Sequence, residues 1–499
     1  MKMNKIYKSL GLLLALSLFS SCYKDHSVNG DHPLAVVKVT EPIASVQTAA
    51  FGEVTVIKSP AYTITTGASV TPSYEWIVDG VVVSTEKDLS YSPTSYGKHD
   101  ARLRMYTPDG SYFYRFTIDV PYRYVDGLYV LASNEGKTIL SYLPGGEKTD
   151  AFDLDAFGRS NPTIDMTGDP QSMVIYRYVP GSGVSRGYLG ISLGLPTRYY
   201  RVSADSLKVL SPRISFTNPV DFSHASGNQA TVREYFISGA NVWEMERSAN
   251  VPAKKHDKYL SPVAPGYSLA SAIVNWRALT GTRISEGMAF FDNAGSNLLY
   301  MILGSRVTVK KVRTFAASAF PGGAPEETNP FEGMTLIDMK SAGEGNYTYN
   351  YTLLLLKRNS DSKYFVARLT AGDFAQSQNV DGATVSMVEF TEGTPTHLMP
   401  NLGGTAALVA TADKVYFYNM ANATATTHPA WISLPAGQTI ASMALTSDNR
   451  LFIGANGTGT GLVGSIYSYN VAGITPVLLK SEEGITGKIK QIVYRQFNN

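Results

Sequence analysis

Apolar and polar residues alternate with a period of two along much of the chain, and turn-forming residues separate these stretches. In one example, Ala101, Leu103 and Met105 alternate with Arg102 and Arg104. Because successive side chains of a strand point to opposite faces, such alternation is typical of strands with one buried face. Over residues 34–122 the turns recur at roughly eight to twelve positions, as in antiparallel β-sandwiches. The pattern therefore predicts an all-β protein that begins with a sandwich domain at 34–122.

The sandwich segment contains two strong turn signals. Residues 74–80 read Tyr-Glu-Trp-Ile-Val-Asp-Gly, a strand that runs into an Asp-Gly turn, and residues 107–111 form a second turn before another alternating stretch. We expect Trp76 to lie in the core, as the tryptophan of immunoglobulin-like sandwiches does. A strand tryptophan in some other sandwich is the alternative. His99, at the start of a strand, is expected to be exposed to solvent.

A second pattern begins at residue 127, where apolar runs come in pairs around polar turns. The first pair is 128–131 with 138–143. The onsets of successive pairs lie roughly 40 to 65 residues apart, which brackets the blade length of about 40–50 residues in β-propellers. Further pairs are 173–178 with 188–193, 235–237 with 242–245, 288–291 with 298–302, 351–356 with 364–369, 406–411 with 415–418, and 451–454 with 465–469.

These pairs predict a β-propeller of about seven blades over residues 127–499. The last apolar stretch, 488–494, is expected to close the ring by pairing with the first blade. A row of separate β-sandwiches is the alternative architecture. Helices should be few, and 268–279 is the one stretch for which a helix is weighed.

Composition excludes two classes of protein. The 499 residues include one cysteine, so a disulfide scaffold is ruled out. Lys and Arg number 43 against 41 Asp and Glu, which is too balanced to create the basic field that nucleic-acid binding needs. We therefore expect no nucleic-acid partner.

The first residues follow the order of a bacterial secretion signal. Lys2, Lys5 and Lys8 precede or border an apolar run of about ten residues, roughly half of what a membrane-spanning helix needs. Small residues then lead directly to Cys22. This arrangement resembles the lipobox of bacterial lipoproteins, in which the cysteine is acylated. It implies a signal peptide at 1–21, lipidation at Cys22 and a polar tether at 22–33; the alternative is an ordinary secretory precursor with a buried cysteine.

Order and content together resemble the PKD-like family lipoproteins of Bacteroidetes. The Tyr-x-Trp strand at 74–80 and the Asp-Gly-Ser turn look like a polycystic-kidney-disease (PKD) type immunoglobulin-like module, and Tyr-Lys-Asp follows Cys22 closely. The resemblance implies a lipid-anchored protein of the outer membrane that faces the cell surface. It also implies partners, namely a TonB-dependent outer-membrane transporter and a SusD-like lipoprotein, with a glycan or peptide as ligand. It supplies no known binding residues.

Motifs for catalysis and for cofactors are weak. The Gly-x-Ser-x-Gly motif at 183–187 lies in a predicted hairpin loop, whereas a nucleophile elbow needs a strand-to-helix turn. Residues 292–297 have oxygen ligands at calcium-like spacing but lack the terminal glutamate of an EF-hand, so a turn is favoured. The glycine-rich stretch 457–461 lacks the lysine and helix of a phosphate loop. We expect no catalytic residue, no cofactor and no metal.

Surface chemistry leaves two further candidates. Asp205-Ser206-Leu207 resembles the short acceptor of Bacteroidetes O-glycosylation. Aromatic rings near turns can stack on sugars, although packing between blades uses the same residues. The aromatic candidates are Trp243, Trp276, Trp431 and the pair Tyr199 and Tyr200.

Two functions from different classes remain. The favoured one is a non-catalytic, lipid-anchored accessory binding protein of an outer-membrane uptake system for glycans or peptides. The alternative is a propeller enzyme, similar to polysaccharide lyases or glycosidases, with its active site at one mouth of the central channel. A cluster of carboxylates, His and Arg there would indicate the enzyme, and the carboxylates considered are Glu234, Asp292 and Asp413.

Overall fold

The computed structural model divides the chain into two compact units, Met1–Tyr122 and Arg123–Asn499. Each unit is described by itself. The structure describes residues 34–65, 70–146, 151–176, 187–194, 198–210, 214–215, 225–226, 233–238, 241–246, 254–255, 268–280, 283–302, 308–316, 326–342, 351–370, 384–401, 406–420 and 428–495.

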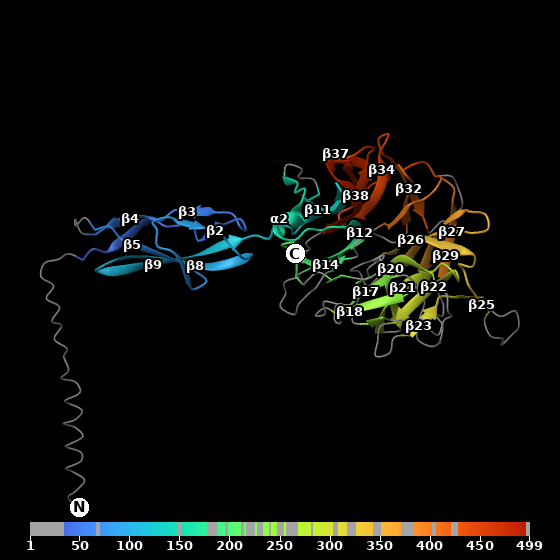
Figure 1. Cartoon of the computed structure of the whole chain (residues 1–499), viewed down its shortest axis with the longest axis horizontal. Helices are drawn as coiled ribbons and strands as arrows, with labels where there is room; N and C mark the ends of the chain where they lie inside the picture. The colour runs from blue at the N-terminus through green and yellow to red at the C-terminus, as the bar shows by residue number, and fades with distance from the viewer. Residues whose placement is uncertain are drawn as a thin grey trace, which may run out of the picture. The chain divides into compact units, whose positions relative to one another are not determined.

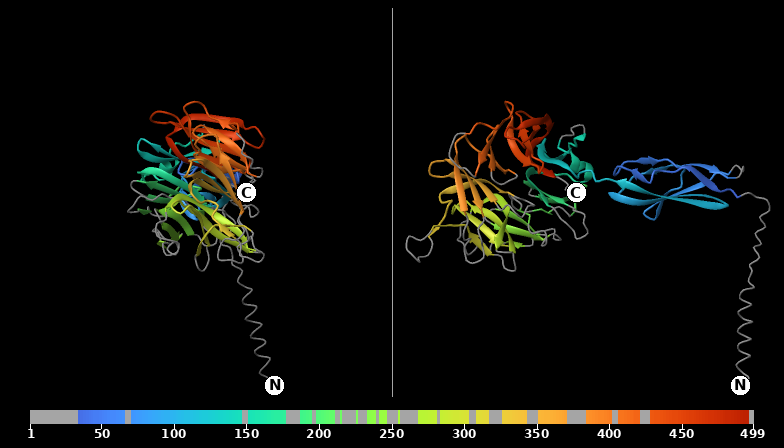
Figure 2. Two further views of the ribbon diagram at one scale, coloured as in Figure 1. Left: turned by 90° about the vertical axis from the view of Figure 1, so that its right-hand side faces the viewer. Right: turned by 180° about the vertical axis from the view of Figure 1, so that it is seen from behind.

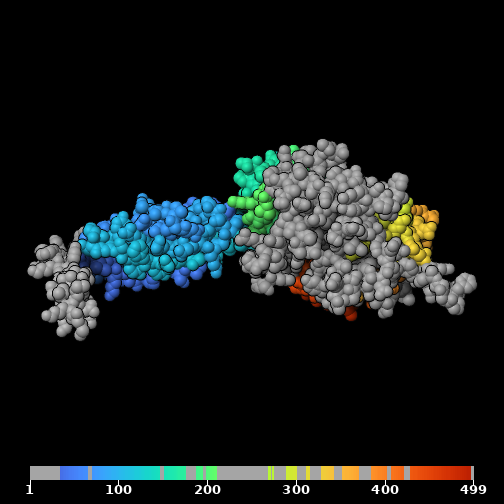
Figure 3. Space-filling model, turned by 90° about the horizontal axis from the view of Figure 1, so that it is seen from below, coloured from blue at the N-terminus to red at the C-terminus, as the bar shows by residue number. Residues whose placement is uncertain are grey.

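The first unit consists of strands in one large and two small sheets (Figure 1). The large sheet has the order β2-β9-β8-β5-β6, in which β2 pairs with β9 in parallel and the other pairs are antiparallel. In the space-filling view this unit, in blue, is one continuous elongated body (Figure 3). Its strands are β1 (Val37–Glu41), β2 (Val46–Thr48), β3 (Thr55–Ile57), β4 (Ala61–Ile64), β5 (Ser73–Val78), β6 (Val81–Ser84), β7 (Leu89–Tyr91), β8 (Gly97–Thr107) and β9 (Gly110–Val120).

One hydrophobic core joins these sheets. Alternate residues of β5, β8 and β9 pack against residues of the small sheets β1-β4 and β3-β7. Trp76 is fully buried at its centre, as predicted, and its indole N–H donates to the Glu86 carbonyl at 2.9 Å. The Asp-Gly turn is also confirmed, because Asp79 and Gly80 both have positive φ between the paired strands β5 and β6.

The prediction for His99 is wrong. Its side chain is buried, because Nδ1 lies 2.6 Å from an Asp79 carboxylate oxygen and Nε2 lies 3.0 Å from the Ser95 carbonyl. The turn that the sequence placed correctly thus carries an unforeseen partner for a histidine on the adjacent strand β8.

The second unit is built from sheets of three or four antiparallel strands. Seven such sheets occur among its described residues, together with the two-stranded pair β24-β25. The first three sheets contain β10 (Gly127–Asn134), β11 (Lys137–Pro144) and β38 (Lys488–Arg495); β12 (Asp169–Tyr176), β13 (Tyr188–Gly194), β14 (Arg198–Ser203) and β15 (Ile214–Ser215); and β16 (Ala225–Ser226), β17 (Arg233–Ser238), β18 (Asn241–Glu246) and β19 (Lys254–Lys255).

The remaining sheets follow the same order along the chain. A single α-helix, α2 (Ala156–Ser160), lies in the described part, and Asp155 caps it by accepting the Gly158 N–H. The strands are β20 (Leu269–Thr280), β21 (Arg283–Asp292), β22 (Asn297–Ile302) and β23 (Thr308–Lys311); β24 (Thr314–Ala316) and β25 (Glu326–Thr328); β26 (Met334–Ala342), β27 (Tyr351–Arg358), β28 (Tyr364–Thr370) and β29 (Thr384–Phe390); β30 (His397–Pro400), β31 (Ala406–Ala410), β32 (Lys414–Asn419) and β33 (Ile432–Ser433); and β34 (Thr439–Leu445), β35 (Arg450–Asn456), β36 (Gly464–Asn470) and β37 (Val477–Thr486).

These sheets follow one another around a ring, so the second unit is β-propeller-like (Figure 1; Figure 2 repeats the order from behind). One edge strand of each sheet lies toward the middle of the ring, and we call these the inner strands. Contacts between neighbouring inner strands join β20 to β26, β26 to β30, β30 to β34, β34 to β38 and β38 to β12. The C-terminal strand β38 pairs with β10, which confirms the predicted closure.

All seven predicted hairpins are confirmed as paired strands, from β10-β11 to β35-β36. The stretch 268–279 is not a helix, because β20 occupies it. Among the residues that the structure describes, no helix has the length and apolar composition needed to cross a membrane.

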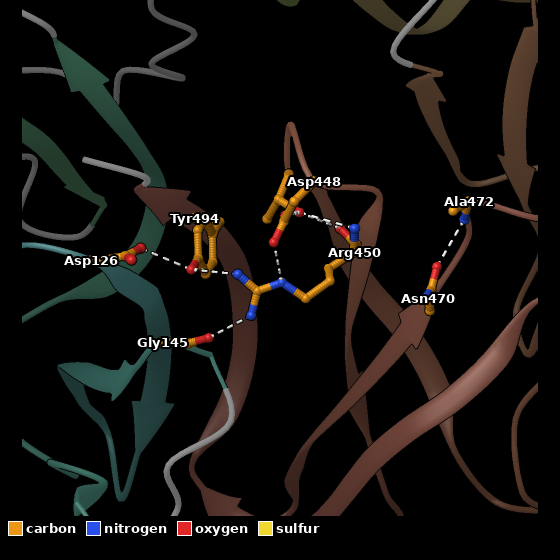
Figure 4. Close-up of polar contacts among 8 residues, drawn as sticks. Asp126, Gly145, Asp448, Arg450, Asn470, Ala472 and Tyr494 are labelled. Atoms are coloured by element: carbon orange, nitrogen blue, oxygen red, sulfur yellow. Dashed lines mark hydrogen bonds and ion pairs between the residues drawn. The ribbon is translucent and has the colours of Figure 1, made fainter. Parts of the chain in front are cut away.

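Arg450 holds the two ends of the ring together (Figure 4). Its guanidinium donates to the Gly145 carbonyl at 2.8 Å, to the Tyr494 hydroxyl oxygen at 3.0 Å and to the Asp448 carboxylate at 2.9 Å. Tyr494 donates in turn to Asp126 at 2.8 Å. The arginine therefore links the last sheet to both the first and the final strands of the unit.

Candidate functional site

The inner strands share a local irregularity. In β12, β26, β34 and β38 the pairing with the neighbouring strand slips by one residue, which is a β-bulge. The extra residues are Gln171, Ile337, Ala441 and Lys490.

A polar residue follows each bulge: Ser172, Asp338, Ser442 and Gln491. The Ser172 hydroxyl lies 2.7 Å from that of Ser192, and the other three side chains accept backbone N–H groups. The Asp338 carboxylate accepts the Leu398 N–H at 3.0 Å, which links β26 to β30. Similarly, the Ser442 hydroxyl oxygen accepts the Ile492 N–H at 3.1 Å, and the Gln491 amide oxygen accepts the Met173 N–H at 2.7 Å. Successive inner strands are thereby joined through side chains. We call Asp338, His397, Ser442 and Gln491 the polar ring.

His397, at the start of β30, is the fourth residue of the polar ring. Its Nδ1 lies 2.9 Å from the Thr396 hydroxyl oxygen, and its ring also hydrogen bonds to the backbone of Ala441 on β34. Burial is the largest influence on its pKa and lowers it; the Asp338 charge raises the pKa, whereas Lys340 and Lys490 lower it. The pKa of His397 lies below its usual range, so the imidazole is neutral near pH 7.

Two lysines place positive charge near the polar ring. Lys340, on β26, lies 3.2 Å from a carboxylate oxygen of Asp338. Lys490, the extra residue of the β38 bulge, is exposed and close enough to His397 to act on its pKa. Neighbouring inner strands therefore bring a carboxylate, an imidazole and two ammonium groups to one region.

Hydrogen bonds within the chain hold the Asp338 carboxylate and the His397 ring in place. Both carboxylate oxygens of Asp338 accept backbone N–H groups, because Met339 donates to Oδ1 at 2.8 Å and Leu398 to Oδ2. The His397 ring is likewise engaged, because it contacts the Thr396 hydroxyl and hydrogen bonds to the backbone of Ala441. These contacts fix the orientation of the Asp338 carboxylate and the His397 ring relative to the inner strands.

The three carboxylates weighed for an enzyme do not meet here. Asp292 accepts N–H groups from Ser268, Ala294 and Gly295, so its carboxylate stabilises the β21-β22 turn. Asp413 lies in the β31-β32 turn, and Glu234 lies on β17, which is an interior strand of its sheet. Among the described residues, no group of three His, Cys, Asp or Glu side chains is placed to hold a metal ion.

The candidate glycosylation site is wrong. Asp205, Ser206 and Leu207 are all buried, and Asp205 lies 2.5 Å from the Arg495 guanidinium. A glycosyltransferase could not reach this serine in the folded chain. Residues 183–186 of the Gly-x-Ser-x-Gly motif, Cys22 and the first 33 residues lie outside the described residues.

The aromatic candidates divide into two groups. Tyr199 and Tyr200 are fully buried in the core, so they are not available to stack on a sugar. Trp431 is partly exposed; its ring centre lies 5.4 Å from that of Phe417, and its N–H donates to the Ile474 carbonyl at 2.7 Å. Trp243 and Trp276 lie on β18 and β20, but their side chains lie outside what the structure describes.

The sequence analysis missed Lys340, Lys490 and the whole polar ring. The sequence does contain a pattern: each residue of the polar ring, and also Ser172 on β12, stands directly before Met, Leu or Ile. The pairs are Ser172-Met173, Asp338-Met339, His397-Leu398, Ser442-Met443 and Gln491-Ile492. Such a two-residue pattern also occurs at Ser386-Met387, on a different kind of strand, so only the structure distinguishes it.

Comparison with known proteins gives structural likenesses only. No protein family matches the sequence, and no curated protein does. A quinoprotein alcohol dehydrogenase-like protein from Bacteroides thetaiotaomicron is 14% identical, with 92% of this chain and 99% of that chain covered at a TM-score of 0.45.

Two other solved structures are similarly distant. A DUF4784 family protein from Bacteroides caccae is 8% identical over 93% of this chain and 100% of its own, with a TM-score of 0.30. The WD40 domain of SCAP from fission yeast is 9% identical over 62% and 69%, with a TM-score of 0.35.

Proposed function

We propose that this protein is a lipid-anchored, non-catalytic binding protein that serves an outer-membrane uptake system. The observation that carries the proposal is the state of Asp338 and His397. They are the acid and base that the described inner strands bring together, and both are engaged by hydrogen bonds within the chain. The lysines beside them present donors that suit a ligand.

The anchor supports the same function. Acylation at Cys22 would fix the chain at the outer membrane, and residues 22–33 would give it reach. The first unit, which resembles a PKD-like immunoglobulin-like module, would act as a spacer for the propeller-like unit. Confinement beside a transporter raises the effective concentration of a ligand, so even weak binding there contributes to uptake.

The partners proposed are a TonB-dependent transporter and a SusD-like lipoprotein, and the ligand is a glycan or a peptide. The test is affinity purification of the full chain from outer membranes, with Cys22→Ala as the matched variant. We expect the wild-type chain to bring down a transporter and the Cys22→Ala chain to appear in the soluble fraction without it. A wild-type chain that fractionates as soluble, or that captures no transporter, would contradict the proposal.

A further inference from the structure

The large sheet of the first unit has one face in the core and one face outside it. Every second residue of β8 is buried in the core, so Arg102, Arg104 and Tyr106 lie on the opposite face. The pairing of β8 with β9 places Arg115 directly opposite Arg102 and Phe113 directly opposite Arg104, on that same face. We call these five residues the arginine face.

Cation–π contacts connect the arginine face into one patch. The guanidinium groups of Arg102 and Arg104 lie over the Phe113 ring, 5.9 and 5.8 Å from its centre. Arg104 also lies over the Tyr106 ring, at 4.6 Å. Phe113 is 53% exposed although it is apolar, so the patch is open to solvent. The two rings therefore hold two guanidinium groups in place at the surface of the unit.

The positive charge of the arginine face is only partly balanced. Arg104 pairs with the Glu75 carboxylate at 3.2 Å. Among the residues that the structure describes, Arg102 and Arg115 form no ion pair, although the exposed Asp100 lies two residues before Arg102. Like charges directly opposite each other on paired strands are unfavourable. An anion bound between Arg102 and Arg115 would remove this repulsion.

Exposed apolar residues lie on both sides of the arginine face. Val82 on β6 pairs with Ile77 of β5, which pairs with Arg102, so all three lie on one face. Val46 on β2 pairs with Thr117 of β9, also on that face. Val82 and Val46 are 49% and 54% exposed. Exposed apolar residues that gather around cations indicate a docking surface for a protein or a membrane.

We infer that the arginine face binds the phosphate groups of an anionic membrane surface. A guanidinium group presents its N–H donors as a planar fork that matches phosphate oxygens. Phe113, Val46 and Val82 then contact the boundary between lipid headgroups and acyl chains, where apolar side chains are favourable. This inference goes beyond the proposed function, in which the first unit acts only as a spacer.

The lipid anchor favours a membrane over an acidic protein as the occupant. The chain from Cys22 to Val37, where β1 begins, spans at most about 50 Å when it is fully extended. Acylation at Cys22 would thus keep the first unit within this distance of the bilayer, whereas a protein partner would have to reach it by diffusion. Confinement of this kind makes weak contacts effective.

The experiment measures binding to lipid vesicles by co-sedimentation at low salt. The chain used is 22–499 with Cys22→Ala, so that no acyl group contributes. Vesicles of phosphatidylcholine and phosphatidylglycerol in equal parts are compared with vesicles of phosphatidylcholine alone. Arg102→Gln combined with Arg115→Gln tests the arginine face. Lys38→Gln combined with Lys58→Gln removes the same charge elsewhere in the unit, on β1 and directly after β3, and is the matched control.

We expect the chain to sediment with the anionic vesicles and not with the neutral ones, and added salt to release it. Loss of both arginines should weaken binding roughly 30-fold, because each cation near an anionic bilayer contributes about fivefold. The lysine control should bind nearly as the wild type does. Circular dichroism shows whether the double variant folds. Arg115→Gln alone, which leaves the contacts with Phe113 intact, should weaken binding about fivefold.

Four results would overturn the inference. Equal binding to neutral and anionic vesicles would show that negative charge is not recognised, and no binding to either would leave an acidic protein as the partner. Release by excess glycerol 3-phosphate would assign the arginine face to a soluble phosphate. Equal losses in the arginine and lysine variants would show that only net charge matters. Capture of a transporter from membranes tests the proposed function separately, so the two failures can be told apart.

Discussion

At the scale of single residues, Asp79 has a role that its position in a turn does not reveal. Its carboxylate accepts the Asp100 N–H at 3.0 Å and pairs with the buried His99. Burial by itself lowers the pKa of His99, but the hydrogen bonds to Asp79 and Ser95 and the charge of Asp79 outweigh it and raise the pKa above its usual value. Protonation of His99 therefore stabilises the first unit.

The pH dependence of this pair follows from the direction of the shift. Its contribution is complete below about pH 6.5, the unfolded pKa of histidine, and is lost as the pH rises through the higher folded value. We expect Asp79→Asn to lower the free energy of unfolding by about 1–2 kcal/mol at pH 6, and by less at pH 8.5. Urea unfolding at both pH values measures this, with the exposed neighbour Asp100→Asn as control. A loss that does not change with pH would contradict the assigned role.

Arg450 joins the last four-stranded sheet to the sheet that closes the ring. Three hydrogen bonds join it to Gly145, Asp448 and Tyr494, and its guanidinium also lies over the Tyr494 ring at 5.3 Å. We expect Arg450→Met to lower the free energy of unfolding by about 2–3 kcal/mol, because Gly145 and Tyr494, at the sheet that closes the ring, both lose their donor from the last four-stranded sheet. Asp448→Asn should cost less than about 1 kcal/mol, since that ion pair is partly exposed. Equal effects of the two variants in thermal unfolding would argue against a closing role.

At the scale of elements, the sequence predicted the interior strands of the sheets and the inner strands β12 and β38, but it missed the inner strands β26, β30 and β34. Strands such as β31 and β13 are buried on both faces, so they read as continuous apolar runs with clear turns between them. The inner strands carry bulges and polar residues that interrupt the period of two. Their position becomes apparent only from contacts between strands that are distant in sequence, such as those of β26 with β30 and of β30 with β34.

Gly464, at the start of β36, tests the packing where the last sheet meets β38. A Cβ atom there would lie 2.2 Å from the Gly487 carbonyl oxygen and 2.6 Å from a Thr486 methyl carbon, both too close for real contacts. We expect Gly464→Ala to destabilise the chain by about 1–3 kcal/mol in thermal unfolding. Gly473→Ala, in the connection between β36 and β37, is the control, because its Cβ would meet nothing nearer than 3.9 Å. If both variants melt alike, the close approach at Gly464 does not exist in solution.

At the scale of the whole molecule, the division into two units falls between Tyr122 and Arg123. Arg123 is exposed, whereas Tyr124 is fully buried in the core of the second unit. Limited trypsin digestion should therefore cut after Arg123 before it degrades either unit, since cleavage needs an accessible backbone. Arg123→Gln should remove this first cut. Early cleavage inside β5 to β9 instead would show that the first unit does not fold as one body.

The central claim is that the protein captures its ligand and makes or breaks no bond. The most direct measurement is to incubate the purified full chain with a defined mixture of oligosaccharides and to record the masses of both the retained and the free fraction. The account predicts that some members of the mixture are retained and that every mass is unchanged after prolonged incubation. New shorter masses that disappear when one carboxylate of the chain is replaced would contradict it.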